Sequence, residues 1–201
     1  MADKSGKPPK QNAKCFNVAE INPELAAIAL KMRPNIHWIE IPLVGRLAIV
    51  PWPRSGEWLN DEISGWKAEG VDLVVSLLES EEVAELDLYD EAGLCDKHAI
   101  EFVSFPVPDR GVPSSRPAAL ALARLLLSRV IEGKTAAVHC RAGIGRSSVI
   151  AACALVCLGT NPDRAFDMIA KARRVTVPDT EEQRAWVRAF AEWLQPDPKR
   201  S

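Results

Sequence analysis

The feature of this sequence that most restricts its fold is a glycine-rich turn between an expected strand and an expected helix. The turn covers residues 139–147 and reads HCRAGIGRS. Residues 134–138 before it have the pattern of a short buried strand, and residues 148–158 after it are apolar on every side, as in a buried helix that Gly159 ends. This order predicts a unit of an α/β fold with Cys140 at the carboxyl end of a strand.

The turn combines a thiol, a guanidinium and backbone amides in a way that suits a phosphoryl group. A strand-to-helix turn collects N–H groups and the positive end of a helix dipole, which attract an anion and lower the pKa of a thiol. Cys140 is therefore the expected nucleophile, and the planar guanidinium of Arg146 can bind two phosphoryl oxygens. The amides expected to bind phosphate belong to Arg141, Ala142, Gly143, Ile144, Gly145 and Arg146.

Two neighbours of these groups have expected supporting roles. Ser147 can hydrogen-bond the Cys140 sulfur and stabilise it as a leaving group, and His139 can orient the turn through nearby backbone carbonyls. A purely structural interpretation makes Cys140 a small core residue and Arg146 a surface cation. It gives no common reason for the arginine, the glycines and the flanking elements.

The pattern His-Cys, five residues, Arg-Ser at residues 139–147 resembles the signature loop of the cysteine-dependent protein tyrosine and dual-specificity phosphatases. Over residues 36–194 the chain is most similar to the group around cyclin-dependent kinase inhibitor-associated phosphatase. The resemblance implies transfer of a phosphoryl group to Cys140 and hydrolysis of the phosphocysteine, with no metal or other cofactor.

The leaving oxygen of such a reaction needs a proton donor, for which Asp109 is the candidate. Asp109 lies in a loop rich in proline and glycine, residues 105–113, at the carboxyl end of an expected strand. Composition alone also fits an aspartate that only shapes a turn. The resemblance favours the acid, since residues 109–113 are similar to the Asp-x-Gly-x-Pro variant of the family's acid loop. Val107 stands where tyrosine-specific members carry tryptophan, so a tryptophan-hinged closure is not expected.

Gln183 has two interpretations. Residues 177–183 resemble the glutamine-bearing loop that positions the hydrolytic water in some members of the superfamily. Thr180, three residues before Gln183, also fits a helix capping box ahead of the amphipathic residues 185–194.

The whole chain predicts an α/β fold with a central, mostly parallel sheet of four to five strands, flanked by helices and with an N-terminal hairpin. Further strands are expected over residues 36–41, 46–50, 71–77 and 100–105, and further helices over residues 57–69, 80–92, 117–132 and 185–194. We expect a tail over residues 1–15, a single phosphatase domain over residues 16–195 and a tail over residues 196–201.

Composition limits the partners and the compartment. The 201 residues can bury one sizeable core, and the net charge of −2 gives no reason to expect nucleic-acid binding. No apolar run is long enough for a transmembrane helix, so no membrane partner is expected. An odd number of cysteines without a signal-peptide pattern indicates a reducing, cytoplasmic location; they are Cys15, Cys95, Cys140, Cys153 and Cys157.

The expected substrate is a phosphorylated protein. Lipid and inositol-phosphate phosphatases of the superfamily often carry lysines inside the loop, where this chain has Ala142 and Ile144. Phosphotyrosine is expected, and whether phosphoserine and phosphothreonine are also substrates stays open.

Two alternative functions are a rhodanese-like sulfur transferase, which needs neither Arg146 nor Asp109, and a catalytically silent phosphopeptide-binding module. Such a module would normally have lost Cys140, Arg146 or Asp109.

Overall fold

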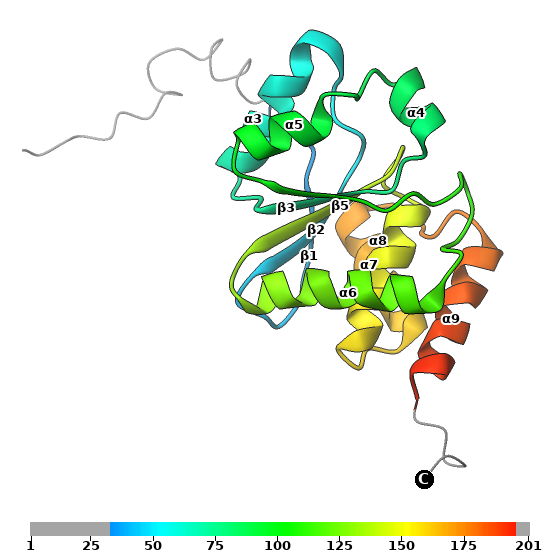
Figure 1. The fold of residues 1–201 in the computed structure, drawn as a ribbon. Coiled ribbons are helices and arrows are strands. Elements are labelled where there is room, and N and C mark those ends of the chain that lie inside the picture. Colours follow the sequence, from blue (N-terminus) through cyan, green and yellow to red (C-terminus); the bar gives the residue numbers. More distant parts are fainter. Residues whose placement is uncertain (1–32, 196–201) are drawn as a thin grey trace, which may run out of the picture. The chain divides into compact units, whose positions relative to one another are not determined.

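A five-stranded sheet forms the centre of the structure, a computed structural model that describes residues 33–195 (Figure 1). The strand order is β1-β2-β5-β3-β4; β1 and β2 pair antiparallel, and the other three neighbouring pairs are parallel. The strands are β1 His37–Ile39, β2 Arg46–Val50, β3 Leu73–Ser76, β4 Glu101–Ser104 and β5 Thr135–His139. The expected mostly parallel sheet with an N-terminal hairpin is confirmed.

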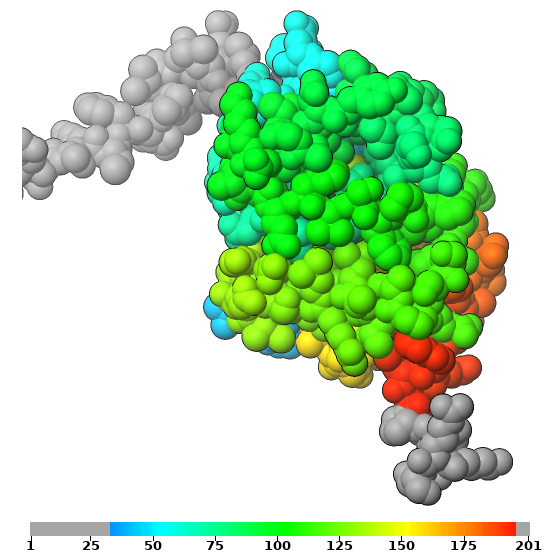
Figure 2. Space-filling model, in the orientation of Figure 1, coloured from blue at the N-terminus to red at the C-terminus, as the bar shows by residue number. Residues whose placement is uncertain are grey.

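Helices cover both faces of this sheet. In Figure 1, α3, α4 and α5 lie on one face and α6 to α9 on the other, and Figure 2 shows that the segment from α4 to α6 (green) forms most of the visible surface. The helices are α3 Leu59–Ala68, α4 Ser80–Glu85, α5 Glu91–Lys97, α6 Arg116–Ile131, α7 Arg146–Cys157, α8 Pro162–Arg173 and α9 Glu181–Leu194, with a 3-10 turn η1 at Gly56–Trp58. Among residues 33–195, no helix is long and apolar enough to cross a membrane.

Alternating strand residues form the hydrophobic cores on the two faces of the sheet. Along β2, Leu47 and Ile49 belong to the core cluster under α6 and α7, whereas Ala48 and Val50 belong to the cluster under α3 and α5. Successive strand side chains point to opposite faces, so one buried strand serves both helical layers.

One expected helix is wrong in its extent. The structure divides residues 80–92 into α4 and α5, because Asp87 between them has a left-handed backbone (φ 52°), which ends the first helix. Aspartate is among the few side chains that adopt this conformation readily.

Helix α8 was not among the expected elements, although Asn161 and Pro162 mark its start in the sequence. The Asn161 side chain accepts a hydrogen bond from the N–H of Asp163.

Some expectations concern residues outside 33–195. The tail over residues 1–15, the domain start at residues 16–32, Cys15 and the tail over residues 196–201 lie outside the described residues. Within the described residues, 34–195 form one compact unit.

Candidate active site

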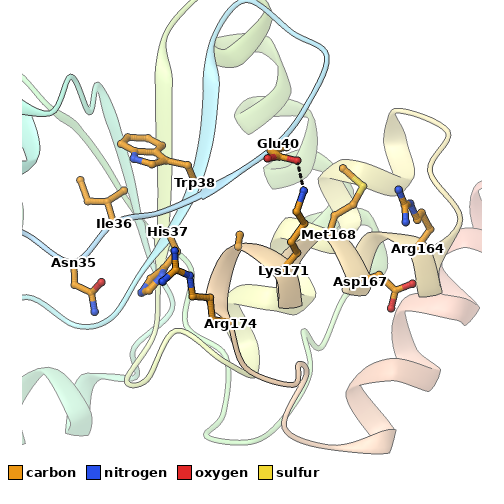
Figure 3. A pocket seen from close by; sticks show the side chains of 11 residues that line it. Asn35, Ile36, His37, Trp38, Glu40, Arg164, Asp167, Met168, Lys171 and Arg174 are labelled. Carbon is orange, nitrogen blue, oxygen red and sulfur yellow. Dashed lines mark hydrogen bonds and ion pairs between the residues drawn. The ribbon is translucent and has the colours of Figure 1, made fainter.

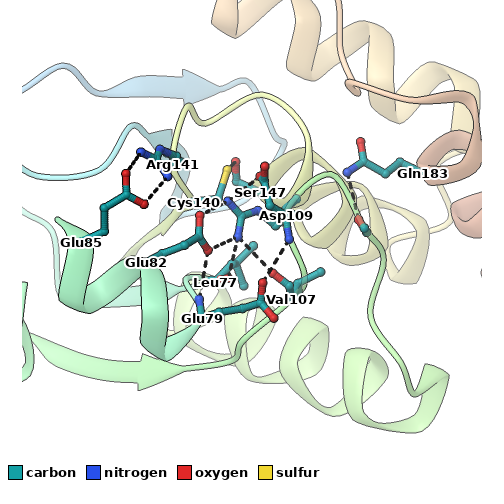
Figure 4. Close-up of polar contacts among 12 residues, drawn as sticks. Leu77, Glu79, Glu82, Glu85, Val107, Asp109, Cys140, Arg141, Ser147 and Gln183 are labelled. Atoms are coloured by element: carbon teal, nitrogen blue, oxygen red, sulfur yellow. Dashed lines mark hydrogen bonds and ion pairs between the residues drawn. The ribbon is translucent and has the colours of Figure 1, made fainter.

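The parallel strands β2 and β3 end level with His139, directly before the loop that carries Cys140. Figure 4 shows the side chains that surround this loop. Cys140 follows β5 directly and is 3% exposed. Its Sγ lies 3.2 Å from Oγ of Ser147, the second residue of α7. The expected contact between this serine and the sulfur is therefore present.

Backbone amides from two neighbouring segments bind carbonyl oxygens of residues 139–147. The Leu77 N–H donates to the carbonyl of His139 (3.0 Å), and the Trp52 N–H donates to the carbonyl of Arg141 (3.3 Å). The C=O and N–H of a trans peptide point in opposite directions, so the amides that follow these carbonyls are turned away from the neighbouring strands. Gly143 has φ 68°, and a Cβ there would lie 2.9 Å from the Val50 carbonyl oxygen, so a larger residue would displace the loop.

Arg146 lies at the first position of α7 and is 2% exposed. Its Nη1 and Nη2 donate to the two carboxylate oxygens of Glu82, at 2.5 and 2.8 Å, and Nη1 also donates to the Val107 carbonyl at 3.0 Å. Burial acts to lower the pKa of Arg146, but the hydrogen bonds to Glu82 and the charges of Cys140 and Asp109 raise it above its usual value. The guanidinium is thus held both charged and oriented.

Glu82 is a site residue that the sequence interpretation missed. It lies on α4, at the carboxyl end of β3, and its carboxylate also accepts the Glu79 N–H at 3.1 Å. Burial raises the pKa of Glu82, but the hydrogen bonds from Arg146 and from the Glu79 backbone bring it below its ordinary value. The acidic run ESEEVAE at residues 79–85, directly after a central strand, was the available signal.

Asp109 reaches the same guanidinium from the loop that follows β4. Its Oδ1 lies 3.0 Å from Nη2 of Arg146, while 62% of its side chain is exposed. The loop is fixed at its backbone, since the Asp109 N–H donates to Glu79 Oε2 at 3.2 Å and the Gly111 N–H donates to the Pro108 carbonyl at 2.8 Å. An exposed carboxyl on an anchored loop is well placed to meet a bound substrate.

Gln183 connects two loops of the site. Its N–H donates to Oγ1 of Thr180 (3.2 Å), so this part of the expected helix cap is confirmed. Its side-chain Nε2 donates to the Gly111 carbonyl at 2.9 Å, beyond Asp109, and a Cβ on Gly145 would lie only 3.0 Å from the same Nε2. Gln183 therefore lies between the aspartate loop and the signature loop.

His139 is fully buried and differs from its expected role. Neither ring nitrogen has a hydrogen-bond partner among residues 33–195, so the expected bonds to loop carbonyls are not formed. Nε2 lies 2.9 Å from Oε1 of Glu91 on α5, a close approach without hydrogen-bond alignment. The histidine thus faces α5, whereas its own backbone carbonyl is held by Leu77.

The Arg141 side chain points to the rim of the site. Its guanidinium makes two hydrogen bonds with the Glu85 carboxylate, at 2.9 and 2.6 Å, and lies 5.6 Å from the ring centroid of Trp52. Arg141 therefore brings its backbone amide to the loop, while its charge is paired with α4 in this structure.

Glu82→Gln is expected to lower kcat/KM for aryl phosphates by about tenfold to 10²-fold, because a small displacement of a catalytic group has effects of this size. The glutamine keeps one acceptor for Arg146 and loses the negative charge, so we expect the free energy of unfolding to fall by about 2 kcal/mol. The lowered pKa of Glu82 means that the carboxylate stabilises the fold above the ordinary glutamate pKa and loses this contribution as pH falls through the lowered value. The stability difference from wild type should therefore shrink in acid.

The matched control is Glu81→Gln on the exposed side of α4. Steady-state kinetics and chemical denaturation across pH measure both quantities. Equal effects of the two substitutions would contradict a specific role for Glu82.

Comparison with solved structures places this fold among the cysteine-dependent phosphatases. Kinase-associated phosphatase, with its catalytic-site cysteine replaced by serine, gives a TM-score of 0.74 at 19% identity, covering 81% of this chain and 96% of that chain. Tk-PTP in its active form gives a TM-score of 0.64 at 28% identity, covering 79% and 97%.

The sequence comparisons define the family. The model of the Swiss Army Knife protein, DSP-PTPase phosphatase domain, matches residues 34–192, and the chain belongs to this family. Cyclin-dependent kinase inhibitor 3 of Sus scrofa is 30% identical over 111 residues, which are 54% of this chain and 49% of that protein. Protein tyrosine phosphatase domain-containing protein 1 of Danio rerio is 36% identical over 111 residues, which are 55% of this chain and 14% of that protein. The match spans less than half the length of either relative.

Proposed function

We propose that this chain is a protein phosphatase that hydrolyses phosphotyrosine, with phosphoserine and phosphothreonine as further candidate substrates, through a phosphocysteine at Cys140. The observation that carries the proposal is the position of the Arg146 guanidinium. It lies 3.0 Å from Asp109 and at the base of the loop of Cys140. A nucleophile, an anion clamp and an acid thus share one sheet edge.

In the first step the Cys140 thiolate attacks phosphorus, a sulfur–phosphorus bond forms and the ester oxygen leaves. Asp109 gives that oxygen its proton, so no free alkoxide or phenoxide is released. The non-bridging oxygens are held by Arg146 and by the amides of residues 141–146, which stabilise the charge of the transition state.

In the second step water attacks the phosphocysteine and the sulfur leaves as a thiolate. Asp109, now ionised, takes a proton from the water, and the product is inorganic phosphate. Ser147, 3.2 Å from the sulfur, donates a hydrogen bond that stabilises the leaving thiolate. We assign Gln183 to holding the Asp109 loop through Gly111, because its amide nitrogen is already engaged there.

The proposal also covers the partner and the cellular compartment. The partner is a phosphorylated protein, and the proposed compartment is the reducing cytoplasm. This location is supported by the free thiols of the described cysteines, Cys95, Cys140, Cys153 and Cys157.

Asp109→Asn tests the acid. We expect kcat to fall by about 10²- to 10⁴-fold with poor leaving groups such as phosphotyrosine, because an amide cannot protonate the departing oxygen. With an activated aryl phosphate whose phenol needs no proton, the loss should be much smaller. The measurement is steady-state hydrolysis of a series of aryl phosphates of graded leaving-group pKa, with metal chelated.

Asp96→Asn, at an exposed carboxyl on α5, is the control and should behave like wild type. A loss independent of the leaving group would assign the acid role to another residue. No turnover by the wild-type chain with any phosphomonoester would overturn the proposed function itself.

A further inference from the structure

The last residue of α8, Arg173, contacts the signature loop. Nη2 of Arg173 donates to the Ala142 carbonyl oxygen at 3.0 Å. Nε of Arg173 is buried and has no hydrogen-bond partner among residues 33–195. Arg173 is therefore half-buried, and its one hydrogen-bonded acceptor within the described chain is a peptide carbonyl of the loop.

Other side chains of α8 line a cavity. Arg164, Met168 and Lys171 line a cavity of about 800 Å³ between α8 and β1 (Figure 3). Lys171 Nζ is paired with Glu40 Oε2 there at 2.7 Å. The helix thus carries several cations, of which Arg173 is the one bonded to the signature loop.

The peptide that Arg173 holds has two ends. Its carbonyl belongs to Ala142 and its N–H to Gly143, and in a trans peptide these point in opposite directions. A carbonyl drawn outward to Arg173 therefore turns the Gly143 N–H inward, to the side of Cys140. The same relation holds for the peptides whose carbonyls are bound by the Leu77 and Trp52 amides.

We infer that Arg173 is a positioning residue that fixes the Ala142–Gly143 peptide with its N–H directed into the phosphate cradle. The carbonyls of His139 and Arg141 are held by backbone amides, which a substitution does not remove. Of these three carbonyls, only that of Ala142 is held by a side chain. The positive φ of Gly143 makes the dependence understandable, because glycine permits peptide orientations that other residues would restrict.

The electrostatic setting agrees with this role. Burial lowers the pKa of Arg173, while the negative charge of Cys140 acts to raise it, so the two groups are close enough to interact. A cation at the carboxyl end of α8 is also favoured by the helix dipole. The inference rests on the proposed function, since an oriented amide matters only if an anion occupies the cradle.

The test compares Arg173→Met, Arg173→Lys and, as a matched control, Arg164→Met on the same helix. Binding of vanadate and of inorganic phosphate is measured by calorimetry, together with kcat and KM for an aryl phosphate and the thermal midpoint. Arg173→Met should weaken binding of both anions by about tenfold or more, the factor expected when a charge-assisted hydrogen bond is lost.

Lysine at position 173 can still donate to the Ala142 carbonyl, so it should recover much of the lost affinity. Arg164→Met should leave anion affinity unchanged. Unchanged anion binding in Arg173→Met, with normal turnover by wild type, would overturn the positioning role alone. A drop in thermal midpoint without a change in affinity would reduce Arg173 to a packing residue. Wild type that binds vanadate but hydrolyses no phosphomonoester would contradict the proposed function and leave the Arg173 comparison valid.

Discussion

Cys140→Ser is expected to lower kcat for aryl phosphates by at least about 10⁴-fold, because a serine hydroxyl stays protonated near neutral pH and is a far weaker nucleophile than a thiolate. The substitution changes only the nucleophile and leaves the anion-binding groups in place. Arg146 and the loop amides remain, so phosphate and vanadate should still bind. The variant should therefore separate binding from chemistry, and a phosphotyrosine peptide should form a stable complex with it.

The measurement combines single-turnover kinetics with acid-quench detection of labelled phosphoenzyme. Wild type should accumulate an acid-stable, thiol-linked phosphoryl group, and Cys140→Ser should not. Cys157→Ser is the matched control, since Cys157 is a partly exposed free cysteine at the end of α7. Turnover of Cys140→Ser near the wild-type level would sink the phosphocysteine mechanism.

Particular residues of the site argue against a sulfur transferase and against a silent phosphopeptide-binding module. A sulfur transferase needs a loop cysteine but has no use for an arginine clamped by a buried glutamate beside a second carboxylate. A silent binding module would have no need of Asp109 held over Arg146 by Glu79. Membership of the phosphatase domain family points the same way.

The signature loop could be predicted from sequence because its parts are local. Strand, turn, nucleophile and helix follow one another within 135–157, so their spacing alone constrains the geometry. Asp109 required one more step, the rule that carboxyl ends of parallel strands share an edge. The ion pair of Arg146 with Asp109 shows that the two residues do lie together at this edge.

Glu82 and Arg173 could not be predicted in the same way. Glu82 lies 64 positions before its partner Arg146, and Arg173 lies 31 positions after its partner Ala142. The acidic run at residues 79–85 marks the region of Glu82 but not which of its carboxylates meets Arg146, and no local motif marks Arg173. Both contacts depend on how α4 and α8 pack on the sheet. The break at Asp87 is similar, because a single left-handed residue separates α4 from α5 without any change in the sequence periodicity.

Arg146→Lys is expected to lower kcat/KM for aryl phosphates by about 10³-fold, even though the positive charge is retained. Lysine has a point charge on a flexible stem and cannot reproduce the planar, two-pronged contact with phosphoryl oxygens. It also cannot satisfy both oxygens of Glu82 and the Val107 carbonyl in the geometry that Arg146 uses. The loss should appear mainly in kcat, because the charge of the transition state is spread over several oxygens.

A double-substitution cycle then asks whether Glu82 acts through Arg146. If the glutamate only orients the guanidinium, Glu82→Gln should reduce kcat/KM in the wild-type chain and change it little in the Arg146→Lys chain. Arg188→Lys, at an exposed arginine paired with Asp163 on α8, controls for the exchange of arginine by lysine and should not affect turnover. Additive losses would show that Glu82 contributes independently of Arg146. A strongly non-additive cycle would mean that the buried pair acts as one unit, so that the acidic run after β3 is as much a part of the site as the loop that carries the nucleophile.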